Sequence, residues 1–189
     1  MTGHLQNFLV VSVAYVVAFS LTLGFVLPLQ QMLMKNVILE VSLLFLPHGI
    51  RILSFWLCGW WAAIYLIPPM YLMLLLSAHS GVILGIWSPL VSILACLIGF
   101  LSVKAIFPAQ GSEGGMSDWK YLALVALVSS VLNSVGMTVL HADEPNLLLA
   151  SGYLIGDMAG FFVCFFILMY AFRFVRLLST ANDHPSPKL

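Results

Sequence analysis

The chain has 189 residues, of which 62% are hydrophobic and only 7% are charged. Soluble domains carry about 25% charged residues, so this composition excludes an ordinary water-soluble domain and indicates a multi-pass membrane protein. The formal net charge is zero, so we expect the lipid bilayer as the surroundings and no nucleic-acid partner.

The predicted fold class is all-α, a polytopic membrane helical bundle of about six transmembrane helices. A helix needs about 20 apolar residues to cross the hydrocarbon core. Uninterrupted runs of this kind lie at 8–28, 83–104, 119–141 and 147–172. Between the first two lies a Pro/Gly-broken segment near 37–69, with breaks expected at Pro47–Gly49 and at Pro68–Pro69. We expect it to supply spans near 49–62 and 63–79, after a partly inserted segment near 37–46.

The basic residues predict how the bundle is oriented. Lys104 and Lys120 flank one loop, and Arg173 and Arg176 follow the last span, whereas the turn before that span has no basic residue. Basic residues concentrate on the cytoplasmic side, so we expect a cytoplasmic C-terminus. Residues 1–178 are predicted to form a single transmembrane domain, and the polar tail 179–189 is predicted to be disordered and cytoplasmic.

One arginine, Arg51, lies within a very apolar stretch. A charge at the bilayer centre costs at least about 2.5 kcal/mol, so it needs a partner. His48 is three residues away and shares its helix face, and a helix beginning after Pro47 offers free N–H groups. Together these features predict a site for a carboxylate or phosphate. The alternative is that Arg51 reaches a membrane surface, with Glu40 as a structural partner.

Asp157 is the second charged residue expected inside the bilayer, about ten residues into the last apolar run. Gly152, Gly156 and Gly160 repeat every four residues around it. Such a stripe lets another helix approach closely. We therefore predict that Asp157 pairs with Arg51 across this contact, although a proton or ligand site is also open.

The candidate ligand-binding residues are thus His48, Arg51 and Asp157, and Glu40 is a further candidate for the ion-pair network. Asn133 is a weaker candidate for a hydrogen bond between helices. The sequence contains no spacing typical of a metal site or a catalytic motif, so we expect no metal, no cofactor and no enzymatic activity.

Two short motifs resemble a known family. Pro47-His48-Gly49-Ile50 is similar to a Pro-x-Gly-Ile stretch, and Gly156-Asp157-Met158-Ala159-Gly160 to a Gly-Asp-x-x-Gly stretch. Both occur in the integral-membrane sensor domain of bacterial histidine kinases and diguanylate cyclases, the first membrane-associated sensor class. The resemblance covers a small part of the chain, and Arg51 departs from it, since a small or apolar residue is expected there.

The resemblance implies a protein of the bacterial inner (plasma) membrane that binds a small ligand or a membrane partner in a sensory role. No output domain is expected after the last span, so sensing implies a separate signalling protein or a membrane protein partner. Two other functions stay open. A substrate-binding subunit of a vitamin-type transporter is similar in size, in six spans and in a small-residue pair like Ala14 and Ala18. The third function is that of a structural subunit of a membrane complex.

Overall fold

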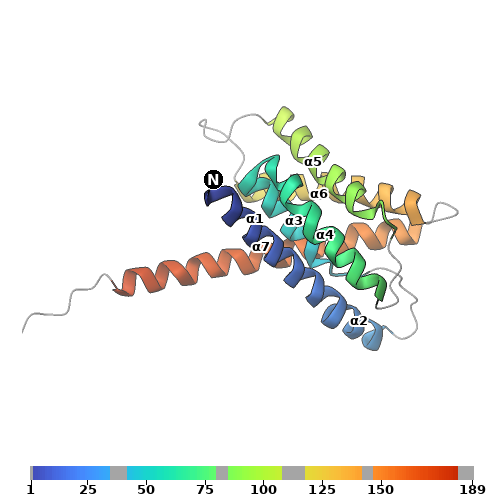
Figure 1. The fold of residues 1–189 in the computed structure, drawn as a ribbon, viewed down its shortest axis with the longest axis horizontal. Helices are drawn as coiled ribbons and strands as arrows, with labels where there is room; N and C mark the ends of the chain where they lie inside the picture. Colours follow the sequence, from blue (N-terminus) through green and yellow to red (C-terminus); the bar gives the residue numbers. More distant parts are fainter. Residues whose placement is uncertain (1, 35–41, 80–84, 108–117, 142–146, 183–189) are drawn as a thin grey trace, which may run out of the picture.

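The structure is a computed structural model that describes residues 2–34, 42–79, 85–107, 118–141 and 147–182. All secondary structure in these ranges is helical (Figure 1), which confirms the predicted class. Five of the described segments are long and apolar enough to cross a membrane, as in a multi-pass membrane protein. They are Gly3–Leu33, Trp61–Ala78, Ser88–Ile106, Trp119–Leu140 and Leu147–Phe174.

The first crossing is one continuous rod made of three elements. These are α1 (Thr2–Leu21), the π-helix η1 (Thr22–Val26) and α2 (Leu27–Leu33), and the backbone stays right-handed helical at both junctions. The Thr22 hydroxyl donates a hydrogen bond of 2.9 Å to the carbonyl oxygen of Ala18. Hydroxyl bonds of this kind bend membrane helices, and single π turns are frequent beside functional sites. The rod is therefore irregular at Thr22.

The next helix, α3 (Leu46–Cys58), is short and follows a non-helical segment, residues 42–45. Pro47 stands at its start, where a fixed φ and a missing N–H are tolerated. The 13 residues of α3 rise only about 20 Å, whereas the hydrocarbon core is about 30 Å thick. The predicted span at 49–62 therefore corresponds to a helix that is too short to cross the bilayer alone.

α4 (Trp61–His79) begins directly after a turn at Gly59, which ends α3 with a φ of 60° and donates its N–H to the carbonyl oxygen of Phe55 at 2.9 Å. Glycine adopts this φ without steric cost. The break predicted at Pro68–Pro69 is wrong, because both prolines lie inside α4. Membrane helices tolerate internal prolines when neighbouring groups satisfy the freed carbonyls.

The remaining helices are α5 (Ser88–Ile106), α6 (Asp118–His141) and α7 (Leu147–Asn182). With 36 residues, α7 rises about 54 Å and extends well beyond the bundle (Figure 1). It continues through residues 179–182, so the prediction of a disordered tail is wrong for these four residues. Residues 183–189 lie outside the described part of the chain.

The helices alternate in direction. The C-terminal halves of the first rod, of α4 and of α6 line a common cavity with the N-terminal halves of α5 and α7, so we call this end of the bundle the cavity end. At the opposite end, His4 of α1 packs against Trp61 of α4, with ring centroids 5.0 Å apart. We call it the terminal end, because α1 begins there and α7 ends there (Figure 1).

The second crossing is discontinuous. α2 ends at the cavity end and α4 begins at the terminal end, so the chain between them has to cross the bundle. α3 covers the half next to the terminal end, and residues 42–45 reach it from the cavity side. The described residues thus contain five segments long enough to cross a membrane and the short helix α3, where the sequence predicted about six transmembrane helices.

The outer surface of the bundle is apolar. Val13, Leu75, Val139 and Ile167 are between 61% and 78% exposed, and they come from four different helices. Soluble monomers rarely expose so many large apolar side chains on one surface. The surface therefore fits a lipid environment.

The glycine stripe of α7 lies against backbone. A Cβ atom built on Gly160 would collide with the carbonyl oxygen of Phe45, and one built on Gly156 with the carbonyl oxygen of Ser42. Gly152 is also buried. Gly156 and Gly160 thus give the predicted close contact. They admit the non-helical segment 42–45, and Gly49 of helix α3 also lies against the carbonyl oxygen of Gly160.

We expect Gly160→Ala to lower the free energy of unfolding by about 1–3 kcal/mol, since the new methyl group meets a backbone atom and forces a shift. Gly24→Ala is the matched control, because its Cβ would have nothing within 4 Å. Reversible unfolding in mixed micelles measures both. Equal stability of the two variants would show that segment 42–45 does not pack on α7.

Candidate functional site

Arg51 is buried in the middle of the bundle. Only 1% of its surface is exposed, so the alternative in which it reaches a membrane surface is wrong. The reason is the short helix that carries it. Because α3 begins inside the bundle, a residue in its second turn lies deep in the core and away from both surfaces. The guanidinium carbon lies 5.6 Å from the centre of the Phe45 ring, a cation–π contact within the same crossing.

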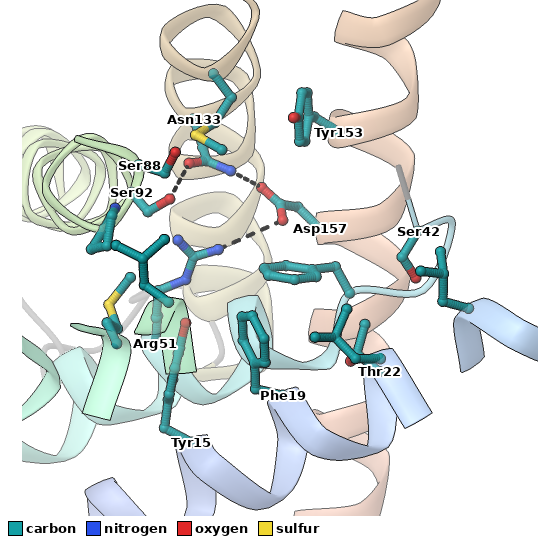
Figure 2. Close-up of a pocket in the computed structure, with 17 residues that line it drawn as sticks. Tyr15, Phe19, Thr22, Ser42, Arg51, Ser88, Ser92, Asn133, Tyr153 and Asp157 are labelled. Carbon is teal, nitrogen blue, oxygen red and sulfur yellow. Dashed lines mark hydrogen bonds and ion pairs between the residues drawn. The ribbon is translucent and has the colours of Figure 1, made fainter. Parts of the chain in front are cut away.

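The charge partner of Arg51 is Asp157 of α7, as predicted. Arg51 Nη2 lies 3.7 Å from Asp157 Oδ1, and both side chains are 1% exposed (Figure 2). Gly156 and Gly160 allow this distance, because they let the crossing that carries Arg51 approach the backbone of α7. Removing either partner alone would leave an uncompensated buried charge.

His48 of the same helix contacts the guanidinium of Arg51. Its Nδ1 lies 3.2 Å from Arg51 Nη2, and its Nε2 lies 3.2 Å from the hydroxyl of Ser130. A guanidinium only donates, so Nδ1 accepts, and the neutral ring carries its hydrogen on Nε2. The separation of 3.4 Å between His48 Nδ1 and Asp157 Oδ2 is then a close approach of two acceptors and not an ion pair.

Asn133 of α6 fixes the carboxylate. Its side-chain nitrogen donates to Asp157 Oδ2 at 2.6 Å, and its side-chain oxygen accepts a hydrogen bond of 2.8 Å from the hydroxyl of Ser92 (Figure 2). All three side chains are buried. The network therefore ties α5, α6 and α7 to α3, and Asn133 fulfils the interhelical role expected for it.

Arg51 keeps unused hydrogen-bonding capacity. Among the described residues its hydrogen bond goes to His48, and its buried Nε has no partner. The distance of 3.7 Å to Asp157 is too long for a hydrogen bond. A guanidinium has five N–H donors, and the one on Nε has no acceptor among the described residues.

A cavity of about 140 Å³ adjoins this network at the cavity end (Figure 2). Arg51, Asp157, Asn133 and Ser92 contribute its polar wall, and His48 does not line it. The apolar lining residues come from the first rod, segment 42–45, α4 and α6, and include Phe19, Leu23, Leu27, Phe45, Met70, Leu74 and Met137. Further polar groups in the lining belong to Tyr15, Thr22, Ser42, Ser88 and Tyr153.

The cavity lies on the half of the second crossing that α3 does not fill. There the crossing is a short non-helical segment whose backbone needs outside partners. The N–H of Leu43 donates to Gln30 Oε1 at 2.7 Å, and the N–H of Phe45 donates to the carbonyl oxygen of Gly156 at 2.9 Å. These bonds hold segment 42–45 against α2 and α7 as the wall of the cavity.

The candidate residues thus separate into three groups. Arg51 and Asp157 line the cavity, His48 contacts Arg51 without lining the cavity, and Glu40 lies outside the described residues. Ser92 and Ser130 take part in the network but were not singled out from the sequence. Serines are common in membrane helices, and their spacing here carries no signal. Within the described ranges, no group of three or more His, Cys, Asp or Glu side chains is placed to hold a metal ion.

In comparisons with known proteins, no family model, no curated protein and no solved structure matches the chain.

A double-mutant cycle tests the ion pair. We expect Arg51→Gln and Asp157→Asn each to cost about 3–5 kcal/mol of stability, because each leaves one buried charge alone. The double variant should cost less than the sum, with a coupling energy of about 0.5–3 kcal/mol. Unfolding in mixed micelles gives the four free energies, and additive values would mean that the two charges do not interact.

Proposed function

We propose that the protein is a membrane-embedded receptor unit that binds a small ligand in the cavity beside Arg51 and Asp157. One observation carries the proposal. A buried guanidinium with an unpartnered Nε lies at the wall of a cavity whose lining is mostly apolar and carries several polar groups. Small-molecule sites are typically concave and mostly apolar, with a few placed polar groups.

The tight packing on the other side of the network favours a ligand-binding site over a conducting pore. Toward the terminal end, Ile52, Phe55 and Val125 have no exposed surface. The cavity therefore ends on a packed core, as a binding site does, whereas a pore needs a continuous polar path.

A sensory role is the first hypothesis for this site. The residues that resemble the sensor domain are those that build the site: Pro47 starts the short helix, and Gly156 and Gly160 admit segment 42–45 beside Asp157. α7 carries Asp157 and runs on to Asn182, so a ligand-dependent shift of α7 would reach the terminal end. A separate signalling protein or membrane protein partner would receive that shift there.

The alternative is a substrate-binding subunit of a vitamin-type transporter. A discontinuous crossing beside a central site is common in transporters. However, Ala18 is 6% exposed and packs inside the bundle with Leu46 and Cys164, so it is not offered to an outside helix. The small volume of about 140 Å³ also favours a ligand smaller than most vitamins.

The proposed location is the bacterial inner membrane with the C-terminus in the cytoplasm. Lys104, Lys120, Arg173 and Arg176 belong to helix segments at the terminal end, and basic residues favour the cytoplasmic side. The cavity then lies nearer the opposite, extracytoplasmic face.

Filling the cavity tests the proposal. We expect Leu74→Trp to abolish ligand-induced stabilisation, because Leu74 lines the cavity, while Leu72→Trp preserves it, because Leu72 is 49% exposed and lies outside the lining. The measurement is thermal unfolding of the full chain in nanodiscs with a panel of small acids, amines, amino acids and alcohols. A ligand at 100 times its Kd adds about 2.7 kcal/mol of stability.

Two results would contradict the proposal. One is a panel in which no compound stabilises the wild type. The other is equal stabilisation of both tryptophan variants, which places binding elsewhere.

A further inference from the structure

The two charges already in the site limit the net charge of the ligand. Arg51 and Asp157 together are neutral, and both are 1% exposed. An unpaired charge in a medium of low dielectric constant is costly. A ligand with a net charge would leave the site charged, whereas a zwitterion or an uncharged molecule keeps it neutral.

The geometry of the pair separates these two neutral classes. Arg51 Nη2 and Asp157 Oδ1 are 3.7 Å apart, Arg51 Nε has no partner among the described residues, and the hydrogen bond from Asn133 goes to the other oxygen, Oδ2. Both residues also line the cavity, so a ligand bound there can offer each charge a stronger contact. A carboxylate on Arg51 and an ammonium on Asp157 Oδ1 would each form charge-assisted hydrogen bonds, which are about twice as strong as neutral ones. An uncharged molecule would leave both charges with weaker contacts.

The size and the apolar wall limit the rest of the ligand. A cavity of about 150 Å³ accommodates benzene, so one of about 140 Å³ suits a small molecule of roughly that size. Phe19, Met70, Leu74 and Met137 are among the apolar residues that line the cavity, and an apolar substituent would be buried against them.

We propose that the ligand is a small zwitterion of the α-amino acid class with an apolar side chain, held with its carboxylate on Arg51 and its ammonium on Asp157. This inference rests on the proposed function and specifies the ligand of the same cavity. Ser92 acts through Asn133 as a positioning residue, because it fixes the amide that holds Asp157 Oδ2.

Matched probes test the inference on the full chain in nanodiscs at neutral pH. Each set contains an amino acid (L-alanine, L-valine or L-leucine), the acid that lacks its amino group, the amine that lacks its carboxyl group, and an alcohol of similar size. Thermal unfolding gives the affinities. We expect at least one amino acid to bind saturably, and its acid, amine and alcohol counterparts to bind at least about tenfold more weakly, since each loses a hydrogen bond to a charged group.

The double variant R51Q/D157N is the key protein control. The single variants leave a lone buried charge and can fail to fold, whereas the double variant keeps both size and net charge, and replacing a whole buried pair is often tolerated. It should lose the preference for the amino acid over its alcohol counterpart. Leu72→Trp should keep that preference, and Leu74→Trp should lose all binding.

Each other outcome overturns the inference. An acid, amine or alcohol that binds as tightly as the amino acid, or a double variant that keeps the preference, excludes a zwitterion held by the two charges. If only another class stabilises the wild type and Leu72→Trp but not Leu74→Trp, the proposed function stands and the zwitterion inference fails. If no compound of any class does so, both fail.

Discussion

The arrangement depends on one interaction, the pairing of Arg51 with Asp157 inside an apolar bundle. Burying either charge alone would be costly. Three features of the fold bring the two side chains together and keep them buried. α3 begins inside the bundle and so places Arg51 at depth. Gly156 and Gly160 remove the side chains that would hold the second crossing away from α7. Asn133 orients the carboxylate so that one oxygen is left for Arg51.

The same arrangement creates the cavity. A full helix in the second crossing would fill the bundle, but a short helix with segment 42–45 leaves space on the cavity side. Exposed backbone at this depth is tolerated only where protein covers it. Gln30 and the carbonyl oxygen of Gly156 supply that cover. The buried charge pair and the cavity are thus both consequences of the short helix α3 and of the non-helical residues 42–45 before it.

Much of the fold follows from the sequence, because apolar runs of about 20 residues have few stable arrangements in a bilayer. The pair of Arg51 and Asp157 was also predictable, since each charge needs a partner and the chain offers few. The position of the second helix break was not. Pro68 and Pro69 are helix breakers by propensity, yet α4 continues through them, while Gly59 ends α3 with a positive φ. The serines of the network gave no sequence signal either, because their roles depend on which helix faces lie against each other.

Arg51 and Asp157 should meet in the core of the membrane-embedded protein. Solid-state NMR can detect this contact, with ¹⁵N in the arginine guanidinium groups and ¹³C in the aspartate carboxyl groups. We expect a dipolar coupling that fits a nitrogen–oxygen separation of 3.7 Å and that disappears in Asp157→Asn. If the Arg51 signal instead shows contact with water or lipid phosphate and no coupling to an aspartate, the two residues do not form a buried pair.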